Sequence, residues 1–179
     1  MKFKTKEELA KYTIEYFLEN HKSPQINEKD IDDSLKIQAS CFVTVYIYGK
    51  LRGCIGDIES DEPLFQNIIK RSISAVSEDF RFLPINISEL PNLSVEVSVL
   101  SPIERYKKIT GGKLIDYLAK ERCGVVLEKD GRKALFLPQV WEDLPDPEEF
   151  LQNLCLKAGL SPEDWKSDAT TVYTFTVEK

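Results

Sequence analysis

The residues best suited to chemistry lie in one short apolar stretch, LRGCIG, at positions 51–56. If this stretch is extended, alternate side chains point to the same face, so Arg52 and Cys54 would lie side by side. A guanidinium next to a thiol favours the thiolate. Gly53 and Gly56 would let another backbone or a ligand approach closely, as glycine inside a strand commonly does. These residues together are typical of a binding or nucleophilic site.

A purely structural interpretation of the same residues is equally consistent with the sequence. Arg52 would then pair with a carboxylate such as Glu96, which lies in the middle of a predicted strand, while Cys54 fills a narrow gap in the core. Reactive cysteines need exposure as well as a neighbouring cation. The residues alone leave both interpretations open.

The remaining cysteines and the single histidine offer no clear alternative centre. Cys41 opens a predicted buried strand and Cys155 lies on the apolar face of a predicted helix, where free cysteine acts as a small hydrophobe. Cys123 stands at a strand entrance with no identifying neighbours. His21 follows a predicted helix, where a solvated helix terminator is expected. A Cys–His pair would have to recruit this one imidazole, which weakens a cysteine-hydrolase interpretation.

The elements that must position these residues alternate irregularly between helices and strands. Thr5 and Glu8 form a capping box for the first helix, and Pro63 marks the start of a second helix. Between them, β-branched and aromatic residues predict a hairpin over 40–56. This irregular alternation favours an α+β fold over a doubly wound α/β fold.

The C-terminal half of the chain carries the same mixture of elements. Asp130-Gly131 suits a type I′ turn in a second hairpin, because both residues tolerate positive φ. Asp146 as a cap and Gly159 as a stop predict a helix between them. An alternating strand over 170–178 is expected to close the chain.

Length and composition narrow the class of protein. A chain of 179 residues suits one domain, or one domain with a small lobe. Its 24 basic and 30 acidic residues give a formal charge of −6. The sequence contains no Lys/Arg-rich run that would attract nucleic acid. The spacing of the cysteines and acidic residues predicts free thiols, no metal ion and no cofactor. Without a membrane-spanning run or a signal peptide, a soluble, cytoplasmic protein with no membrane contact is expected.

LRGCIG resembles the signature of the AMMECR domain family, whose bacterial and archaeal members are called AmmeMemoRadiSam system protein A. The resemblance continues through SEDFRFLPI, ELPNLSVEVSVLSP, GVVLEKDGRKALFLPQVW, PDPEEFLQNLCLKAG and the terminal VYTFTVEK. It covers nearly the whole chain and implies a single AMMECR domain over 1–179. The implied fold is α+β, with antiparallel sheets, helices packed on them, and a larger and a smaller lobe flanking a cleft. The smaller lobe would lie within about 103–140.

The resemblance also implies which residues form the site. The family pattern falls on the six residues of LRGCIG and on Asp79, Phe80, Arg81, Glu96, Pro138, Gln139 and Trp141. The implied binding cleft comprises Arg52, Gly53, Cys54, Gly56, Asp79, Arg81, Glu96 and Gln139. Cys54 is the candidate catalytic residue. One departure concerns loop stiffness, because the family often has a proline pair where this chain reads Leu83-Pro84.

The family name implies association with a MEMO-type protein, similar to metal-dependent ring-cleaving dioxygenases, and with a radical SAM enzyme. It implies no particular reaction. One hypothesis is an accessory protein whose cleft binds a small molecule or a peptide segment in a process run with those partners. The other is an enzyme with Cys54 as nucleophile, Arg52 lowering its pKa and orienting an anionic substrate, and Glu96 or Asp79 transferring protons. The sequence identifies no base for the thiol, which favours the accessory protein.

The two hypotheses share one geometric expectation. Arg52 and Cys54 should project from one face of the first hairpin toward Glu96, Asp79 or Arg81. An RNA-binding module, a third possibility, would need a basic face with aromatic residues that no part of the sequence supplies.

Overall fold

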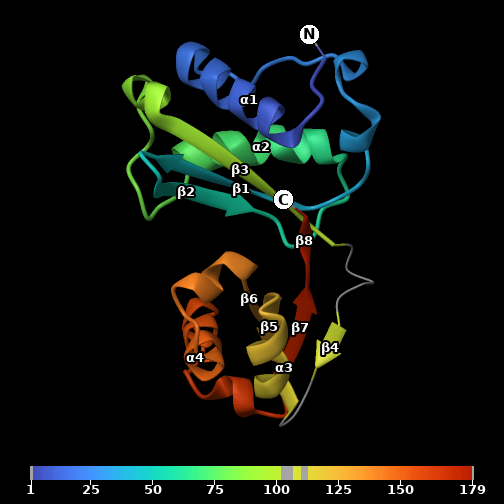
Figure 1. Cartoon of the computed structure of the whole chain (residues 1–179), viewed down its shortest axis with the longest axis vertical. Helices are drawn as coiled ribbons and strands as arrows, with labels where there is room; N and C mark the ends of the chain where they lie inside the picture. Colours follow the sequence, from blue (N-terminus) through green and yellow to red (C-terminus); the bar gives the residue numbers. More distant parts are fainter. Residues whose placement is uncertain (1, 102–106, 110–112, 179) are drawn as a thin grey trace. The chain divides into compact units, whose positions relative to one another are not determined.

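The chain divides into two compact units. A computed structural model describes residues 2–101, 107–109 and 113–178. The first unit comprises Met1–Leu100 with Glu178–Lys179, and the second comprises Ser101–Val177. The segment 103–140, in which the smaller lobe was expected, lies inside the second unit. Helices accompany an antiparallel sheet in each unit, which confirms the α+β fold class (Figure 1).

The sheet of the first unit has the strand order β2-β1-β3-β8. Its strands are β1 (Cys41–Ile47), β2 (Lys50–Gly56), β3 (Leu93–Leu100) and β8 (Val177–Glu178). β1 and β2 form the predicted hairpin, whose turn places Tyr48 and Gly49 at φ values of 52° and 74°. β2 is therefore an edge strand, and its outer backbone groups need partners from outside the sheet.

Two helices cover one face of this sheet (Figure 1). They are α1 (Lys6–Asn20) and α2 (Leu64–Ser77), and three short 3₁₀ helices accompany them: η1 (Glu28–Asp30), η2 (Asp33–Leu35) and η3 (Ile87–Asn92). The capping box of Thr5 and Glu8 is confirmed, and Pro63 occupies the N-cap of α2. The core between helices and sheet includes the fully buried Leu9, Ile14, Val43, Val45, Ile68 and Val97. Since strand side chains alternate, residues next to Val43 and Val45 project from the opposite face.

The second unit has a sheet of order β4-β7-β5-β6. Its strands are β4 (Lys107–Ile109), β5 (Gly124–Lys129), β6 (Arg132–Phe136) and β7 (Thr171–Phe175). Its helices are α3 (Leu114–Glu121), η6 (Pro138–Glu142), α4 (Pro147–Lys157) and η7 (Asp164–Lys166). Asp130 and Gly131 have φ values of 51° and 73°, as the predicted turn requires, and Asp146 caps α4. None of the helices in the described part of the chain combines the length and apolar character needed to cross a bilayer.

The last strand differs from its prediction. The alternating segment 170–178 was expected to form one strand, but it is divided at Thr176 into β7 of the second sheet and β8 of the first. The backbone N–H of Ser101 donates to the carbonyl of Thr176 at 3.0 Å. In the sequence, the alternating apolar residues Tyr173, Phe175 and Val177 continue through both strands, so the sequence pattern contains no sign of the change of sheet.

Trp141, a position of the family pattern, belongs to the core of the second unit. Its ring stacks on Phe150 with 3.8 Å between centroids, and its Nε1–H donates to the carbonyl of Cys123 at 2.8 Å. Leu151, Leu154 and Cys155 complete the buried side of α4. Trp141 therefore stabilises the core of the second unit.

Cys155→Ala is expected to cost ~1 kcal/mol or somewhat more in the free energy of unfolding, because it removes packed atoms from this core. Cys155 is 0% exposed, whereas the neighbouring Leu156 is 55% exposed and serves as the control. Leu156→Ala should change the free energy by less than about 0.5 kcal/mol. Urea denaturation followed by circular dichroism measures both. Lost partner binding in a folded Cys155 variant would contradict the structural assignment.

Candidate functional site

The glycines of LRGCIG allow close approach of the protein's own backbone. A Cβ at Gly53 would overlap the carbonyl oxygen of Ala75 in α2. A Cβ at Gly56 would overlap the carbonyl oxygen of Cys41 and the ring of Phe42. Of the two predicted roles for these glycines, the structure therefore supports backbone packing. Gly53 lets the edge strand lie directly against α2.

Asp79 and Arg81 bind the outer backbone edge of β2 at Cys54. The N–H of Cys54 donates to Oδ2 of Asp79 at 2.9 Å. Nη2 of Arg81 donates to the carbonyl oxygen of Cys54 at 3.3 Å. The two side chains take the place of a neighbouring strand at this residue, which satisfies an edge that would otherwise be open.

The carboxylate of Asp79 is also held by Arg81 through a bidentate pair. Nε of Arg81 lies 2.9 Å from Oδ1 and Nη2 lies 2.7 Å from Oδ2, while the backbone N–H of Arg81 donates to Oδ1 at 3.2 Å. The side chain of Asp79 is only 3% exposed. The hydrogen bonds from Arg81 hold the pKa of Asp79 below its ordinary value, with a smaller contribution from the Cys54 N–H. Hydrogen bonding to Asp79 raises the pKa of Arg81 in turn.

The thiol of Cys54 lies in a row of side chains across three strands. Thr44 of β1 is directly opposite Cys54 of β2 and Glu96 of β3. Directly opposed residues of antiparallel strands share a face, so all three side chains project from the face away from the helices. Oγ1 of Thr44 lies 3.3 Å from Sγ of Cys54. The structure thus brings Cys54 and Glu96 into one row, with Thr44 between them.

Arg52 has partners other than those expected for it. Its Nε donates to Oε1 of Glu89 at 3.2 Å, and its Nη1 and Nη2 donate to the carbonyl oxygens of Leu83 and Pro84. The expected contact with Glu96, Asp79 or Arg81 is replaced by these bonds. The cause is a register irregularity in the hairpin, where Arg52 is the extra residue between Gly53 and Leu51. A bulge of this kind re-aims the side chain, so simple alternation fails at this position.

Two residues of this arrangement were missed from the sequence. Thr44 could have been found by counting the hairpin register from the turn at Tyr48-Gly49. Glu89 is visible as the second half of a capping box with Asn86, and its Oε2 accepts the N–H of Asn86 at 2.8 Å. Its second bond, to Arg52, depends on tertiary structure that local spacing does not encode.

Gln139, the last residue of the expected cleft, lies in η6 of the second unit. Its part in binding stays a prediction. Within residues 2–101, 107–109 and 113–178, His, Cys, Asp and Glu side chains form no group of three or more that could hold a metal ion.

Native thiol reactivity tests the environments of the cysteines. Burial raises the pKa of Cys41 to about 12 and also raises the pKa of Cys155. Thiolates react and thiols do not, so iodoacetamide at about pH 8 should modify Cys54 before Cys41 and Cys155. The guanidinium of Arg81 at the Cys54 backbone should also place Cys54 ahead of Cys123, which is half-buried as Cys54 is. Peptide mass spectrometry over time measures each rate, and unfolding in urea should remove the difference. Faster modification of Cys41 in the native protein would contradict these environments.

The same assay separates the two arginines. The guanidinium that bonds at Cys54 is that of Arg81, whereas Arg52 bonds to Glu89. Arg81→Gln should therefore slow alkylation of Cys54 more than Arg52→Gln does. An equal or larger effect of Arg52→Gln would identify Arg52 as the cation that activates Cys54.

Comparison with known proteins agrees with the resemblance in the sequence. The family model described as AMMECR1 matches residues 7–179. A Methanothermobacter thermautotrophicus protein is 38% identical over 171 residues, which cover 93% of this chain and 87% of that protein. A Methanopyrus kandleri protein is 35% identical over 175 residues, covering 93% and 82%. The crystal structure of an uncharacterized Pyrococcus horikoshii protein superposes with a TM-score of 0.84 at 36% identity, covering 97% of this chain and 87% of that chain. The match extends through both units, and the chain belongs to the AMMECR1 family.

Proposed function

We propose that this chain is an accessory binding protein that works with a MEMO-type protein and a radical SAM protein. The supporting observation is the engagement of Asp79, whose carboxylate binds the Cys54 N–H and the Arg81 guanidinium. A general base is most effective when its pKa lies near the operating pH, and the pKa of Asp79 is shifted down, away from that range. Asp79 therefore joins the edge strand β2 to the loop that begins at Asp79.

The position of the single histidine gives the same indication. His21 is exposed at the C-cap of α1, where it adopts φ 55°. A left-handed cap at a helix end is a common structural position. This use of His21 as a cap supports binding over Cys–His chemistry.

The alternative function is an enzyme that uses Cys54 as its nucleophile. One observation favours it, because the Arg81 guanidinium binds the backbone of Cys54 and a nearby cation promotes thiolate formation. In this alternative, Thr44 and Glu96 would face the substrate from the same row of side chains.

Binding measurements with the purified partners test the proposal. The full chain is titrated with the MEMO-type protein and with the radical SAM protein of the same organism, by calorimetry, and native mass spectrometry follows any co-purified small molecule. A stable complex with either protein is the expected result. Failure to bind both proteins, together with conversion of a substrate by the chain alone, would establish the enzyme in its place.

A further inference from the structure

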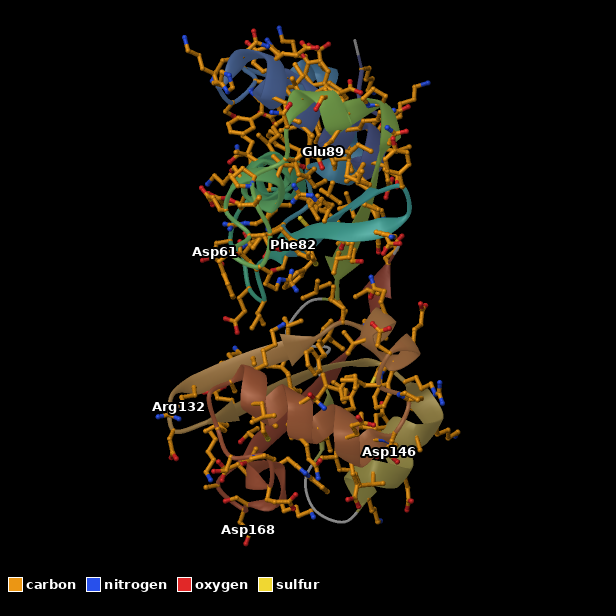
Figure 2. The ribbon with its side chains drawn as sticks, turned by 90° about the vertical axis from the view of Figure 1, so that its left-hand side faces the viewer. Asp61, Phe82, Glu89, Arg132, Asp146 and Asp168 are labelled. Atoms are coloured by element: carbon orange, nitrogen blue, oxygen red, sulfur yellow. The ribbon has the colours of Figure 1, made fainter. Side chains whose placement is uncertain are left out.

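The loop that binds β2 presents two large apolar side chains to solvent. Phe80 is 95% exposed and Leu83 is 81% exposed. Phe82, between them, is half-buried, and Figure 2 shows it together with Glu89 in the first unit. Exposed apolar residues are ordinary when single, but the loop 79–84, which we name the anchor loop, presents two within four residues.

Several hydrogen bonds fix the anchor loop at both ends. Asp79, at its start, is bound by the Cys54 N–H, and Arg52 donates to the carbonyls of Leu83 and Pro84 at its end. The N–H of Phe82 donates to the carbonyl of Asp79 at 3.0 Å, which closes a turn within the loop. A loop ordered before binding loses less conformational entropy when a partner docks. The exposed side chains are thus preorganised.

Arg81 adds a directed positive charge to the anchor loop. Its Nε and Nη2 are used by Asp79 and the Cys54 carbonyl, and its guanidinium carbon lies 5.4 Å from the centroid of the Phe82 ring. The side chain is nevertheless 46% exposed, and its Nη1 has no acceptor among the described residues. The guanidinium is therefore held in place while its outer nitrogen can donate to a group from outside.

We propose that the anchor loop docks onto a partner protein that supplies an apolar pocket for Phe80 and a carboxylate for Nη1 of Arg81. Interfaces concentrate their binding energy in a few aromatic and arginine residues seated in such pockets. This inference rests on the proposed function, since it names the surface by which the accessory protein binds.

Charge argues for a protein partner of this kind over two other occupants. A second copy of the chain, docked about a two-fold axis on this loop, would bring Arg81 close to the Arg81 of its mate. A membrane with anionic lipids would meet the exposed Glu78 beside Phe80. An apolar pocket with one carboxylate placed at Nη1 of Arg81 binds Phe80 and Arg81 together and, unlike a uniformly anionic surface, need not meet Glu78.

Site-specific photocrosslinking of the full chain tests the docking surface. Phe80 is replaced by p-benzoylphenylalanine, and the same replacement at the exposed Leu156 of the second unit is the control. After irradiation in a lysate of the native cells, adducts are identified by mass spectrometry. The captured protein is then purified, and its affinity for wild type, Phe80→Ser and Leu156→Ser is measured at several salt concentrations.

The expected result is a protein that crosslinks at Phe80 and not at Leu156. Phe80→Ser should weaken its binding at least about tenfold, Leu156→Ser should leave it unchanged, and added salt should weaken it through Arg81. The inference is overturned if adducts at Phe80 match those at Leu156, if they contain lipid or a second copy of the chain, or if Phe80→Ser binds as wild type does. Binding of the MEMO-type or radical SAM protein that is insensitive to Phe80→Ser would overturn the inference alone and leave the proposed function standing.

Discussion

Gly53→Ala is expected to destabilise the first unit by ~3 kcal/mol or more, or to prevent its folding. The added methyl group would overlap the carbonyl oxygen of Ala75, a backbone atom of α2 that cannot rotate away. Either the edge strand or the helix must move, and α2 supplies Ile68, Ala75 and Val76 to the buried core. Urea denaturation followed by circular dichroism, with limited proteolysis of the first unit, measures the loss.

Gly49→Ala is the matched control for this substitution. Gly49 lies in the turn of the same hairpin at φ 74°, with open space where an added Cβ would lie. Its substitution adds strain of about 1 kcal/mol and no clash. If Gly53→Ala cost no more than Gly49→Ala, the close contact between β2 and α2 would be wrong.

Asp79→Asn is expected to lower the free energy of unfolding by ~2 kcal/mol at about pH 7. The new amide would place an NH2 group where a carboxylate oxygen now accepts hydrogen bonds. Either the Cys54 N–H or the Arg81 guanidinium would then lose its acceptor. The half-exposed position of Arg81 keeps the cost below that of a fully buried pair. Asp61→Asn, at an exposed residue of the same unit shown in Figure 2, is the control and should cost less than about 0.5 kcal/mol.

The pH dependence of this effect has a definite sign. The folded-state pKa of Asp79 is lowered, so its contribution is fully present above the unfolded value of about 3.9 and is lost as the pH falls through the lower folded value. The difference in stability between wild type and Asp79→Asn should therefore shrink below about pH 4. A difference that grows on acidification would show that Asp79 is not held as an anion.

The elements of the fold follow closely from local chemistry in the sequence. Thr5 and Glu8 cap α1, Asp146 caps α4, and Asp130-Gly131 forms its turn. These features were predictable because each depends on neighbouring residues alone. Glycines were expected where backbones approach, and Gly53 lies at such a contact. The split of the last strand was not predictable, because alternation does not state which sheet a strand joins.

The site was predictable in its members more than in their arrangement. LRGCIG and the segment containing Asp79 and Arg81 were both identified, and they bind each other at Cys54. The proximity of Cys54 to this segment was expected, but the kind of contact was not. The side chains of Asp79 and Arg81, which follow α2 in the chain, bind the backbone of Cys54, and no sequence period reveals such a contact. The partners of Arg52 were predicted wrongly because Arg52 is itself the extra residue of the bulge in β2, and the bulge directs its side chain toward Glu89.

The most direct test of the central claim, that the Cys54 site supports binding and not nucleophilic catalysis, compares wild type with Cys54→Ala. Both proteins are first checked for folding by circular dichroism and thermal melting. Each is then measured for its affinity for the MEMO-type and radical SAM proteins and for turnover of any substrate that the reconstituted set converts. We predict dissociation constants equal within about twofold and the same turnover. A folded Cys54→Ala protein that binds normally but has lost turnover would contradict the claim and establish Cys54 as a nucleophile.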